Sequence, residues 1–358
     1  MIDNRQLAGL SLLKQHNLDA LVFFDLHNVR YLCGFTGTDG ALVLTSRGSW
    51  FTTDSRYTAQ AESEVRADHI RQHRVKLDSV TDILKAAGTH RIGFEAQTLA
   101  YATVEKLKER SPTSWQWVPL GEELEGLRHC KDAQEIEALE SAARLNAIAF
   151  QEIVPQIRPG ATERDIALAL EFSLKRLGGE EKAFDYIVAS GERGAMPHGV
   201  ASGKRLAAGE LVTIDFGTRV NGYHSDETVT LALGEVSERQ REIFDIVLKA
   251  HDLAMDAVKP GVALSDIDSV ARDYIAERRL GDYFGHGLGH GVGLDVHEYP
   301  VVSPRSGAEA EVGAVFTIEP GIYIPGLGGV RIEDTVLVTE SGYRPLTRID
   351  KKYRQIAV

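Results

Sequence analysis

The feature that most constrains the fold is an internal repeat in the second part of the chain. Three segments recur in the same order, and the spacing between the copies grows from 101 residues (258 minus 157) to 107 residues (329 minus 222). Such a series is hard to obtain by chance, so the sequence predicts two similar halves with helices, a Pro-Gly turn and two strands each. The matched segments are IRPGATERDI (157–166) with VKPGVALSDI (258–267), LVTIDFG (211–217) with AVFTIEPG (314–321), and GYHSDETV (222–229) with GVRIEDTV (329–336).

Each half carries two acidic residues at equivalent positions. Asp215 aligns with Glu319, and Asp226 aligns with Glu333. The first pair lies in otherwise apolar strands, where an ionised carboxylate is costly unless a cation binds it, so a duplicated fold with four surface carboxylates is a poor alternative. Pseudo-symmetry would bring all four to the seam between the halves, and two divalent ions would balance their charge. Oxygen-rich ligands favour Mn²⁺, Co²⁺ or Fe²⁺ and, less well, Zn²⁺.

A glycine-rich stretch, HGLGHGVGLDVHE (286–298), can supply a nitrogen ligand. Glycine at every second position from 287 to 293 has the period of a strand, with His286 and His290 on one face and His297 on the other. The bare face would let another backbone approach closely. A phosphate-binding loop is excluded because the lysine and the following helix pattern are missing.

The first part of the chain alternates helix-like and strand-like segments. We expect a helix over 5–16 and strands over 20–24, 41–45 and 91–95, which indicates an α/β domain. Asp132 and Glu135 form a capping-box pattern that begins a long helix with apolar positions up to Val154. We therefore place a domain boundary near 126, with domains 1–126 and 127–358, and expect an α/β (α+β) fold class overall.

Composition limits the possible partners and the compartment. The net charge of -12, without a basic run, argues against a nucleic-acid partner. The two cysteines, Cys33 and Cys130, are far apart and in no CxxC pair, which argues against a disulfide framework or a thiolate metal site. No signal peptide and no apolar run of membrane-spanning length is found, so we expect a cytoplasmic protein without a membrane partner.

The second part resembles the pita-bread metallopeptidases (family M24), which include methionine aminopeptidase, aminopeptidase P and prolidase. The resemblance covers about 130 to 358 and is specific, because six linked motifs occur in the family's order. They are PHG (197–199), TIDFG (213–217), SDETVT (225–230), HGLGHGVGLDVHE, TIEPGIYIP (317–325) and GGVRIEDT (328–335). The segments GFTGTDGALVLT (34–45) and FTTDSRYTAQA (51–61) resemble aminopeptidase P more weakly, and the resemblance implies a creatinase-like N-terminal domain.

The resemblance implies a role for each site residue. Two divalent ions, first of all Mn²⁺, would activate a water molecule, with the bridging ligands being Asp226 and Glu333. The ligand Glu319 would also carry the proton to the leaving nitrogen. The metal ligands implied are Asp215, Asp226, His290, Glu319 and Glu333, and the further catalytic residues are His198, His297, Tyr323 and Arg331. His286 would either contact substrate or bond to a backbone carbonyl, and His198 has the alternative of a loop histidine without a role.

The resemblance also bears on substrate and assembly. Aminopeptidase P and prolidase both cleave before proline, and Val301 after HEYP (297–300), where some prolidases have arginine, favours an Xaa-Pro aminopeptidase. An Xaa-Pro dipeptidase is the alternative, with Arg305 as the clamp on the substrate carboxylate. A creatinase and a non-catalytic peptide-binding module are more remote, because both lack the full ligand set. Members of the prolidase branch are commonly homodimers, which we expect here on resemblance alone.

Overall fold

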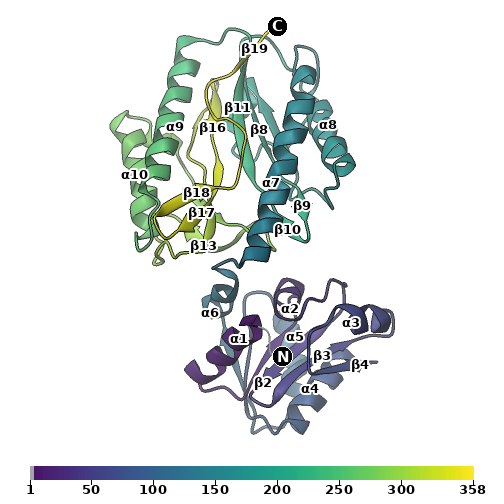
Figure 1. Ribbon diagram of the computed structural model, residues 1–358. Helices are drawn as coiled ribbons and strands as arrows, with labels where there is room; N and C mark the ends of the chain where they lie inside the picture. Colours follow the sequence, from purple (N-terminus) through teal and green to yellow (C-terminus); the bar gives the residue numbers. More distant parts are fainter. Residues whose placement is uncertain (1–3) are drawn as a thin grey trace. The chain divides into compact units, whose positions relative to one another are not determined.

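The computed structural model describes residues 4–358, which divide into two compact units, the second being His129–Val358. The first unit contains a six-stranded sheet in the order β4-β3-β2-β1-β5-β6, with helices between its strands (Figure 1). Its elements are α1 (Asn4–Gln15), β1 (Ala20–Phe23), α2 (Leu26–Cys33), β2 (Ala41–Thr45), β3 (Gly48–Thr53), α3 (Thr58–Glu64), β4 (His69–Gln72), α4 (Lys76–Ala86), β5 (Arg91–Glu95), α5 (Tyr101–Arg110), β6 (Gln116–Leu120), α6 (Glu122–Glu125) and η1 (Gly126–Arg128). The helix and the three strands expected from the sequence are all present, which confirms the α/β character of this part.

The second unit contains two main sheets, in the orders β19-β11-β8-β7 and β13-β12-β14-β17-β18. Helices α7 and α8 lie on one side of the unit and α9 and α10 on the other (Figure 1). The helices are α7 (Ala133–Ile153), η2 (Val154–Gln156), α8 (Glu163–Arg176), η3 (Gly191–Ala195), α9 (Glu238–Ala257), α10 (Leu264–Glu277) and η4 (Gly281–Tyr283). The strands are β7 (Ile187–Ser190), β8 (Glu210–Phe216), β9 (Arg219–Val220), β10 (Tyr223–His224), β11 (Glu227–Leu233), β12 (Gly289–Gly291), β13 (Glu298–Val302), β14 (Val315–Ile318), β15 (Gly321–Ile324), β16 (Gly328–Arg331), β17 (Asp334–Thr339), β18 (Gly342–Pro345) and β19 (Gln355–Ile356).

The repeat in the sequence is a repeat in the structure. The two Pro-Gly turns have the same left-handed glycine, with φ of 91° at Gly160 and 80° at Gly261. The Gly160 N–H donates to Leu206 O and the Gly261 N–H to Ala310 O, both at 2.9 Å. Each half also has its own apolar core, one between α7, α8 and the β8/β11 sheet and one between α9, α10 and the β14/β17 sheet. The duplicated fold is therefore confirmed.

The long helix α7 begins as the sequence indicates and buries most of the expected apolar stripe, because Leu139, Ala143 and Phe150 are at most 2% exposed. Asp132 is its N-cap and forms a complete capping box with Glu135. Ile136 and Ala147, which share this spacing, are half-buried. Glu135 is buried as well, and its carboxylate accepts a hydrogen bond of 3.0 Å from the Tyr223 hydroxyl. The apolar periodicity does not indicate this buried polar pair, because the two residues are 88 positions apart.

The glycine-rich stretch forms a shorter strand than its period predicts. Only Gly289–Gly291 is β12; Glu298 begins β13, and the other residues of the stretch form no helix or strand. The expected close approach of backbone is present: a methyl group on Gly289 would lie 1.9 Å from Thr317 O, and one on Gly291 would lie 2.4 Å from Tyr299 O. β12 is thus held between β13 and β14, which fixes the position of His290.

No helix within residues 4–358 is both long enough and apolar enough to cross a membrane.

Candidate metal centre

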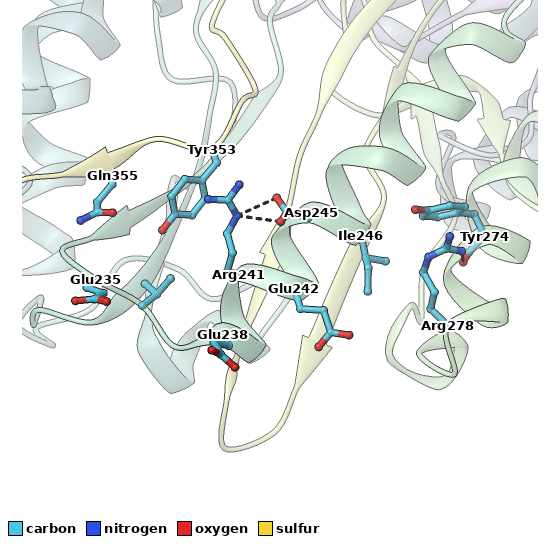
Figure 2. A pocket seen from close by; sticks show the side chains of 11 residues that line it. Glu235, Glu238, Arg241, Glu242, Asp245, Ile246, Tyr274, Arg278, Tyr353 and Gln355 are labelled. Carbon is cyan, nitrogen blue, oxygen red and sulfur yellow. Dashed lines mark hydrogen bonds and ion pairs between the residues drawn. The ribbon is translucent and has the colours of Figure 1, made fainter.

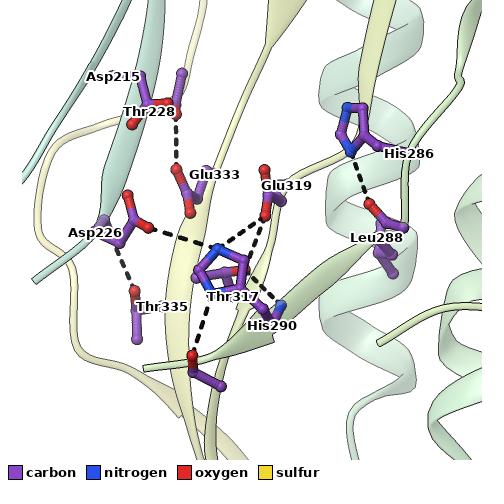
Figure 3. A network of polar contacts seen from close by, with 12 residues as sticks. Asp215, Asp226, Thr228, His286, Leu288, His290, Thr317, Glu319, Glu333 and Thr335 are labelled. Carbon is purple, nitrogen blue, oxygen red and sulfur yellow. Dashed lines mark hydrogen bonds and ion pairs between the residues drawn. The ribbon is translucent and has the colours of Figure 1, made fainter. Parts of the chain in front are cut away.

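The four acidic residues of the repeat come together where strands of the two halves meet (Figure 3). Asp215 lies near the end of β8, and Asp226 directly precedes β11, which pairs antiparallel with β8. Glu319 directly follows β14, and Glu333 directly precedes β17, which pairs antiparallel with β14. Asp215, Asp226 and Glu333 are buried, with 8%, 4% and 1% of their surface exposed.

A threonine of each half donates a hydrogen bond to an acidic residue of the other half. The Thr228 hydroxyl donates to Glu333 Oε2 at 2.7 Å, and the Thr335 hydroxyl donates to the backbone carbonyl of Asp226 at 2.9 Å. The Glu333 N–H donates to Thr228 O at 3.2 Å. These reciprocal bonds join the halves at the point where the acidic side chains meet. They have no local sequence signal, because the bonded residues are more than a hundred positions apart.

His290 is oriented by its own strand so that one ring nitrogen faces the carboxylates. Its Nδ1 lies 3.1 Å from Gly291 O, so this nitrogen carries the proton. Its Nε2 lies 3.3 Å from Glu319 Oε1 and 3.6 Å from Asp226 Oδ2. The ring therefore turns Nε2 toward Glu319 and Asp226: without a metal ion this nitrogen is protonated and donates to Glu319, and it is the nitrogen that an ion would bind in place of that proton.

The buried carboxylates of the cluster repel one another when ionised, so a positive charge among them would stabilise their ionised form. Burial and the charges of Glu333 and its other acidic neighbours raise the pKa of Asp226 well above its usual range. The pKa of Glu333 is raised in the same way by burial and by Glu319 and Asp215. Burial opposes ionisation of Glu319 as well, but the hydrogen bond and charge of His290 outweigh it and lower the pKa of this carboxyl.

The cluster fits divalent metal ions. Asp226, His290 and Glu333 offer ligand atoms that all lie within 4.8 Å of one another. Asp215 Oδ1 is buried and has no hydrogen-bond partner within residues 4–358, which leaves a carboxylate oxygen free to bind a cation. Four carboxylates and one imidazole are a donor set for Mn²⁺, Fe²⁺, Co²⁺ or Zn²⁺.

A chain of hydrogen bonds supports the cluster from one side. Arg331 donates to Asp215 Oδ2 at 2.5 Å, to the Tyr323 hydroxyl at 3.0 Å and to Pro197 O at 3.1 Å. The Tyr323 hydroxyl also lies 2.9 Å from His286 Nε2, and His286 Nδ1 lies 2.7 Å from Gly287 O. The His286 nitrogen that faces the carbonyl must be its donor, so Tyr323 donates to the other nitrogen. Of the two roles considered for His286, this geometry favours the bond to a backbone carbonyl.

The remaining candidate residues lie around this cluster at different depths. The His297 ring lies edge-on to the His290 ring, with 4.2 Å between ring centroids, and partial burial and the charge of His290 lower the pKa of His297. His198 is exposed and directly follows Pro197, which binds Arg331. Arg305 is exposed in the turn after β13, the strand that pairs with β12.

A separate cavity of about 700 Å³ lies against the outer side of α9 (Figure 2). Two cation-π pairs form part of its wall: Arg241 over Tyr353 at 3.9 Å and Arg278 over Tyr274 at 3.3 Å. None of the residues of the carboxylate cluster lines it. The cavity and the carboxylate cluster are therefore separate places in the second unit.

Two pseudo-symmetric halves that enclose a buried carboxylate-histidine cluster define a metal-dependent hydrolase of the pita-bread class. The chain belongs to Metallopeptidase family M24, which matches residues 137–340, and residues 8–130 match the Creatinase/Prolidase N-terminal domain. It is thus a metallopeptidase, and its family implies divalent metal ions. The family resemblance and the two-part fold expected from the sequence are confirmed.

Relatives match over nearly the full length. The chain is 41% identical to an Xaa-Pro dipeptidase of Pyrococcus furiosus, over 94% of this chain and 96% of that protein. Among solved structures it is similar to an Xaa-Pro dipeptidase from Bacillus anthracis, with a TM-score of 0.96, 39% identity and 99% of each chain covered. It is also similar to an X-Pro aminopeptidase from Thermotoga maritima, with a TM-score of 0.88, 34% identity and 98% and 100% covered.

Proposed function

We propose that this chain is an Xaa-Pro dipeptidase that uses two divalent ions, first of all Mn²⁺, at the seam between its halves. The observation that carries the proposal is the meeting of Asp215, Asp226, His290, Glu319 and Glu333 in a chain with 41% identity to an Xaa-Pro dipeptidase over 94% of its length. The relatives' names favour the dipeptidase over the aminopeptidase that Val301 favours in the sequence. The homodimer and the cytoplasmic location stay predictions.

In this proposal Asp215, Asp226, His290, Glu319 and Glu333 would hold the two ions, with Asp226 and Glu333 as the ligands shared between them. The metal pair would supply Lewis acidity, which polarises the scissile carbonyl and acidifies water. In this proposal Glu319 accepts a proton from the attacking water and passes it to the leaving nitrogen.

The other residues orient the metal ligands, stabilise the oxyanion or contact the substrate. Arg331 holds Asp215 in one rotamer through a charge-assisted hydrogen bond, and Tyr323 fixes the Arg331 guanidinium. His297, beside His290 and partly exposed, is positioned to donate to the oxyanion. His198 contacts the substrate from the exposed side.

Hydrolysis of Ala-Pro and Ala-Pro-Ala by the chain loaded with Mn²⁺, with a chelator control, tests the proposal. We expect cleavage of the dipeptide. Cleavage of the tripeptide alone would make the chain an aminopeptidase. If neither peptide is cleaved although metal is bound, the amino-terminal specificity is a different one, and absence of bound metal would overturn the site.

Arg305→Gln tests the carboxylate clamp. A charge-assisted hydrogen bond to a carboxylate contributes about 1.5–3 kcal/mol, so we expect KM for Ala-Pro to rise roughly 10- to 100-fold. The matched control is Arg348→Gln, which replaces another exposed arginine. An unchanged KM in Arg305→Gln would exclude Arg305 as the clamp and leave the dipeptidase assignment to the peptide assay.

A further inference from the structure

A second group of metal-ligand side chains lies just before α7, outside the carboxylate cluster. His129, Cys130 and Glu311 offer ligand atoms that all lie within 4.8 Å of one another. Cys130 Sγ and Glu311 Oε2 are 3.7 Å apart. Two such ligands on a tetrahedral zinc ion, with Zn–S of about 2.3 Å and Zn–O of about 2.0 Å, would be roughly 3.5 Å apart. The present spacing is therefore already close to that of a bound ion.

His129 provides an independent indication of a ligand. Its side chain is buried, with 4% of its surface exposed, yet neither ring nitrogen has a hydrogen-bond partner within residues 4–358. An unpartnered buried polar group is unfavourable, and most such groups in proteins are satisfied. One face of the ring packs against Tyr299, with 5.0 Å between ring centroids. A cation between His129, Cys130 and Glu311 would give the imidazole the partner that it lacks.

We propose that His129, Cys130 and Glu311 bind one divalent transition-metal ion of the Zn²⁺ type, with water as a further ligand. A nitrogen, a sulfur and an oxygen ligand suit such a borderline ion better than Mg²⁺ or Ca²⁺. A thiolate and a carboxylate balance the two positive charges, and the imidazole stays neutral. Cys130 and Glu311 are exposed, so an ion can reach them.

The backbone already holds the ligands near one another. Cys130 forms an isolated β-bridge with Ala314, and the Lys131 N–H donates to Gly313 O at 2.8 Å. The nearby Lys131 ammonium is paired with Glu298 at 2.7 Å, so its charge is balanced. A bound ion would fasten the segment before α7 to the loop before β14, and so link the two halves at a second point.

Binding exchanges a proton for the ion. Burial and the Glu311 carboxylate raise the pKa of the Cys130 thiol to about 11, so the thiol is protonated at neutral pH when no metal is bound. The ion displaces this proton to solvent as the sulfur-metal bond forms. No electron is transferred, and no other reactant is needed.

Co²⁺ is the probe, because a thiolate ligand gives cobalt a sulfur-to-metal charge-transfer band in the near ultraviolet. The ligands proposed for the catalytic centre contain no sulfur, so this band is independent of peptidase activity. We expect the band to report one Co²⁺ per full-length chain in addition to the ions bound at the seam, to vanish in Cys130→Ser and to need at least about tenfold more Co²⁺ in Glu311→Gln. Matched controls are Glu309→Gln, a nearby exposed carboxylate, and Cys33→Ser, the other cysteine, and both should keep the band.

Three outcomes would overturn the proposal: no band in the unaltered chain, a band that persists in Cys130→Ser, or an unchanged titration in Glu311→Gln. His129→Ala adds a test of the third ligand. His129 is buried, so its removal can unfold the chain. The variants at the exposed residues Cys130 and Glu311 therefore decide the test, and circular dichroism checks that each variant is folded.

Discussion

His290 and His297 lie ring against ring but differ in what surrounds them. His290 is fixed by a hydrogen bond to Gly291 O and faces two carboxylates, whereas the side chain of His297 extends to the surface. The first environment is that of a metal ligand, and the second is that of a residue that meets substrate. The family resemblance assigns the same roles from sequence alone.

His290→Ala should therefore lose metal and activity together, because one ligand is removed. His297→Ala should keep its metal and lose turnover by about 10²-fold or more, the usual effect of removing an oxyanion donor. Metal content measured by atomic absorption beside kcat separates the two. Loss of metal in His297→Ala would mean that the two roles are exchanged.

At this scale the sequence predicts the identity of the clustered residues but not their supports. Asp215, Asp226, Glu319 and Glu333 stand out because the repeat aligns them. The hydroxyl of Thr228 and its bond to Glu333 connect positions 105 residues apart, and no local pattern indicates such a pair.

Strand β12 lies very close to the backbone of its neighbouring strand. Gly289 faces the backbone of β14 so closely that a methyl group would lie 1.9 Å from Thr317 O. The glycine period indicates this closeness, but not that the strand is only three residues long. Strand length depends on where β13 and β14 offer partners, which is a property of the folded sheet.

Gly289→Ala should push β12 away from β14 and displace His290. We expect a loss of about 1–3 kcal/mol in the free energy of unfolding, the usual effect of overpacking, together with weaker metal binding. The matched control is Gly285→Ala, where an added methyl meets nothing within 4 Å. Urea denaturation and metal content measure the two effects, and equal behaviour of both variants would contradict the close approach.

Lys351 joins the strands β11 and β17, which directly follow Asp226 and Glu333. Its Nζ lies 2.6 Å from Glu227 and 3.5 Å from Asp334, the residues next to Asp226 and Glu333. Glu227 is fully buried, and the Ile349 N–H also donates to it at 2.9 Å. The sequence indicates nothing of this pairing, since a lone lysine near the end of the chain is usually a surface residue.

Lys351→Met should leave Glu227 as an uncompensated buried charge. Breaking a buried ion pair costs about 3–5 kcal/mol, so the midpoint of urea unfolding should fall sharply. The neighbouring Lys352 is exposed, and Lys352→Met should change stability by less than about 0.5 kcal/mol. A small effect at both positions would show that Lys351 is a surface charge in solution.

For the whole molecule, metal binding should stabilise the folded state. The four carboxylates that would bind the metal meet only when the chain is folded. Metal present at 100 times its Kd adds about 2.7 kcal/mol to the folded state, which for a unit of this size raises Tm by about 5–10 °C. Thermal scans with metal and with a chelator measure the shift. An equal Tm in both would mean that no metal binds at the seam.

The metal-free chain should also depend on pH in a particular direction. The pKa values of Asp226 and Glu333 are raised, so the folded state holds protons that the unfolded state has lost, and stability falls as pH rises above the ordinary carboxyl range. Glu319, with its lowered pKa, acts oppositely, but only below that range. We expect the stability of chelated protein to fall as pH rises above the ordinary carboxyl range, and to fall less steeply in Asp226→Asn. An equal pH dependence of the two proteins, followed by urea unfolding, would contradict the clustering.

The duplication allows the two-half architecture of the molecule to be predicted from the sequence. The side-chain hydrogen bonds that join the halves could not be predicted in this way. A repeat can be recognised from the order of residues alone. A hydrogen bond across the seam depends on the distance between two surfaces that come together only in the folded protein.

The pairing of β19 with β11 has a consequence for the order of events during synthesis. β11 follows directly on Asp226 in the first half, yet its outer neighbour is Gln355–Ile356, more than a hundred residues later. The ribosome makes the first half long before that neighbour, Lys351 or Glu333 exists. A growing chain thus has no complete catalytic centre, and the enzyme gains its activity only after nearly all of residues 1–358 have been translated.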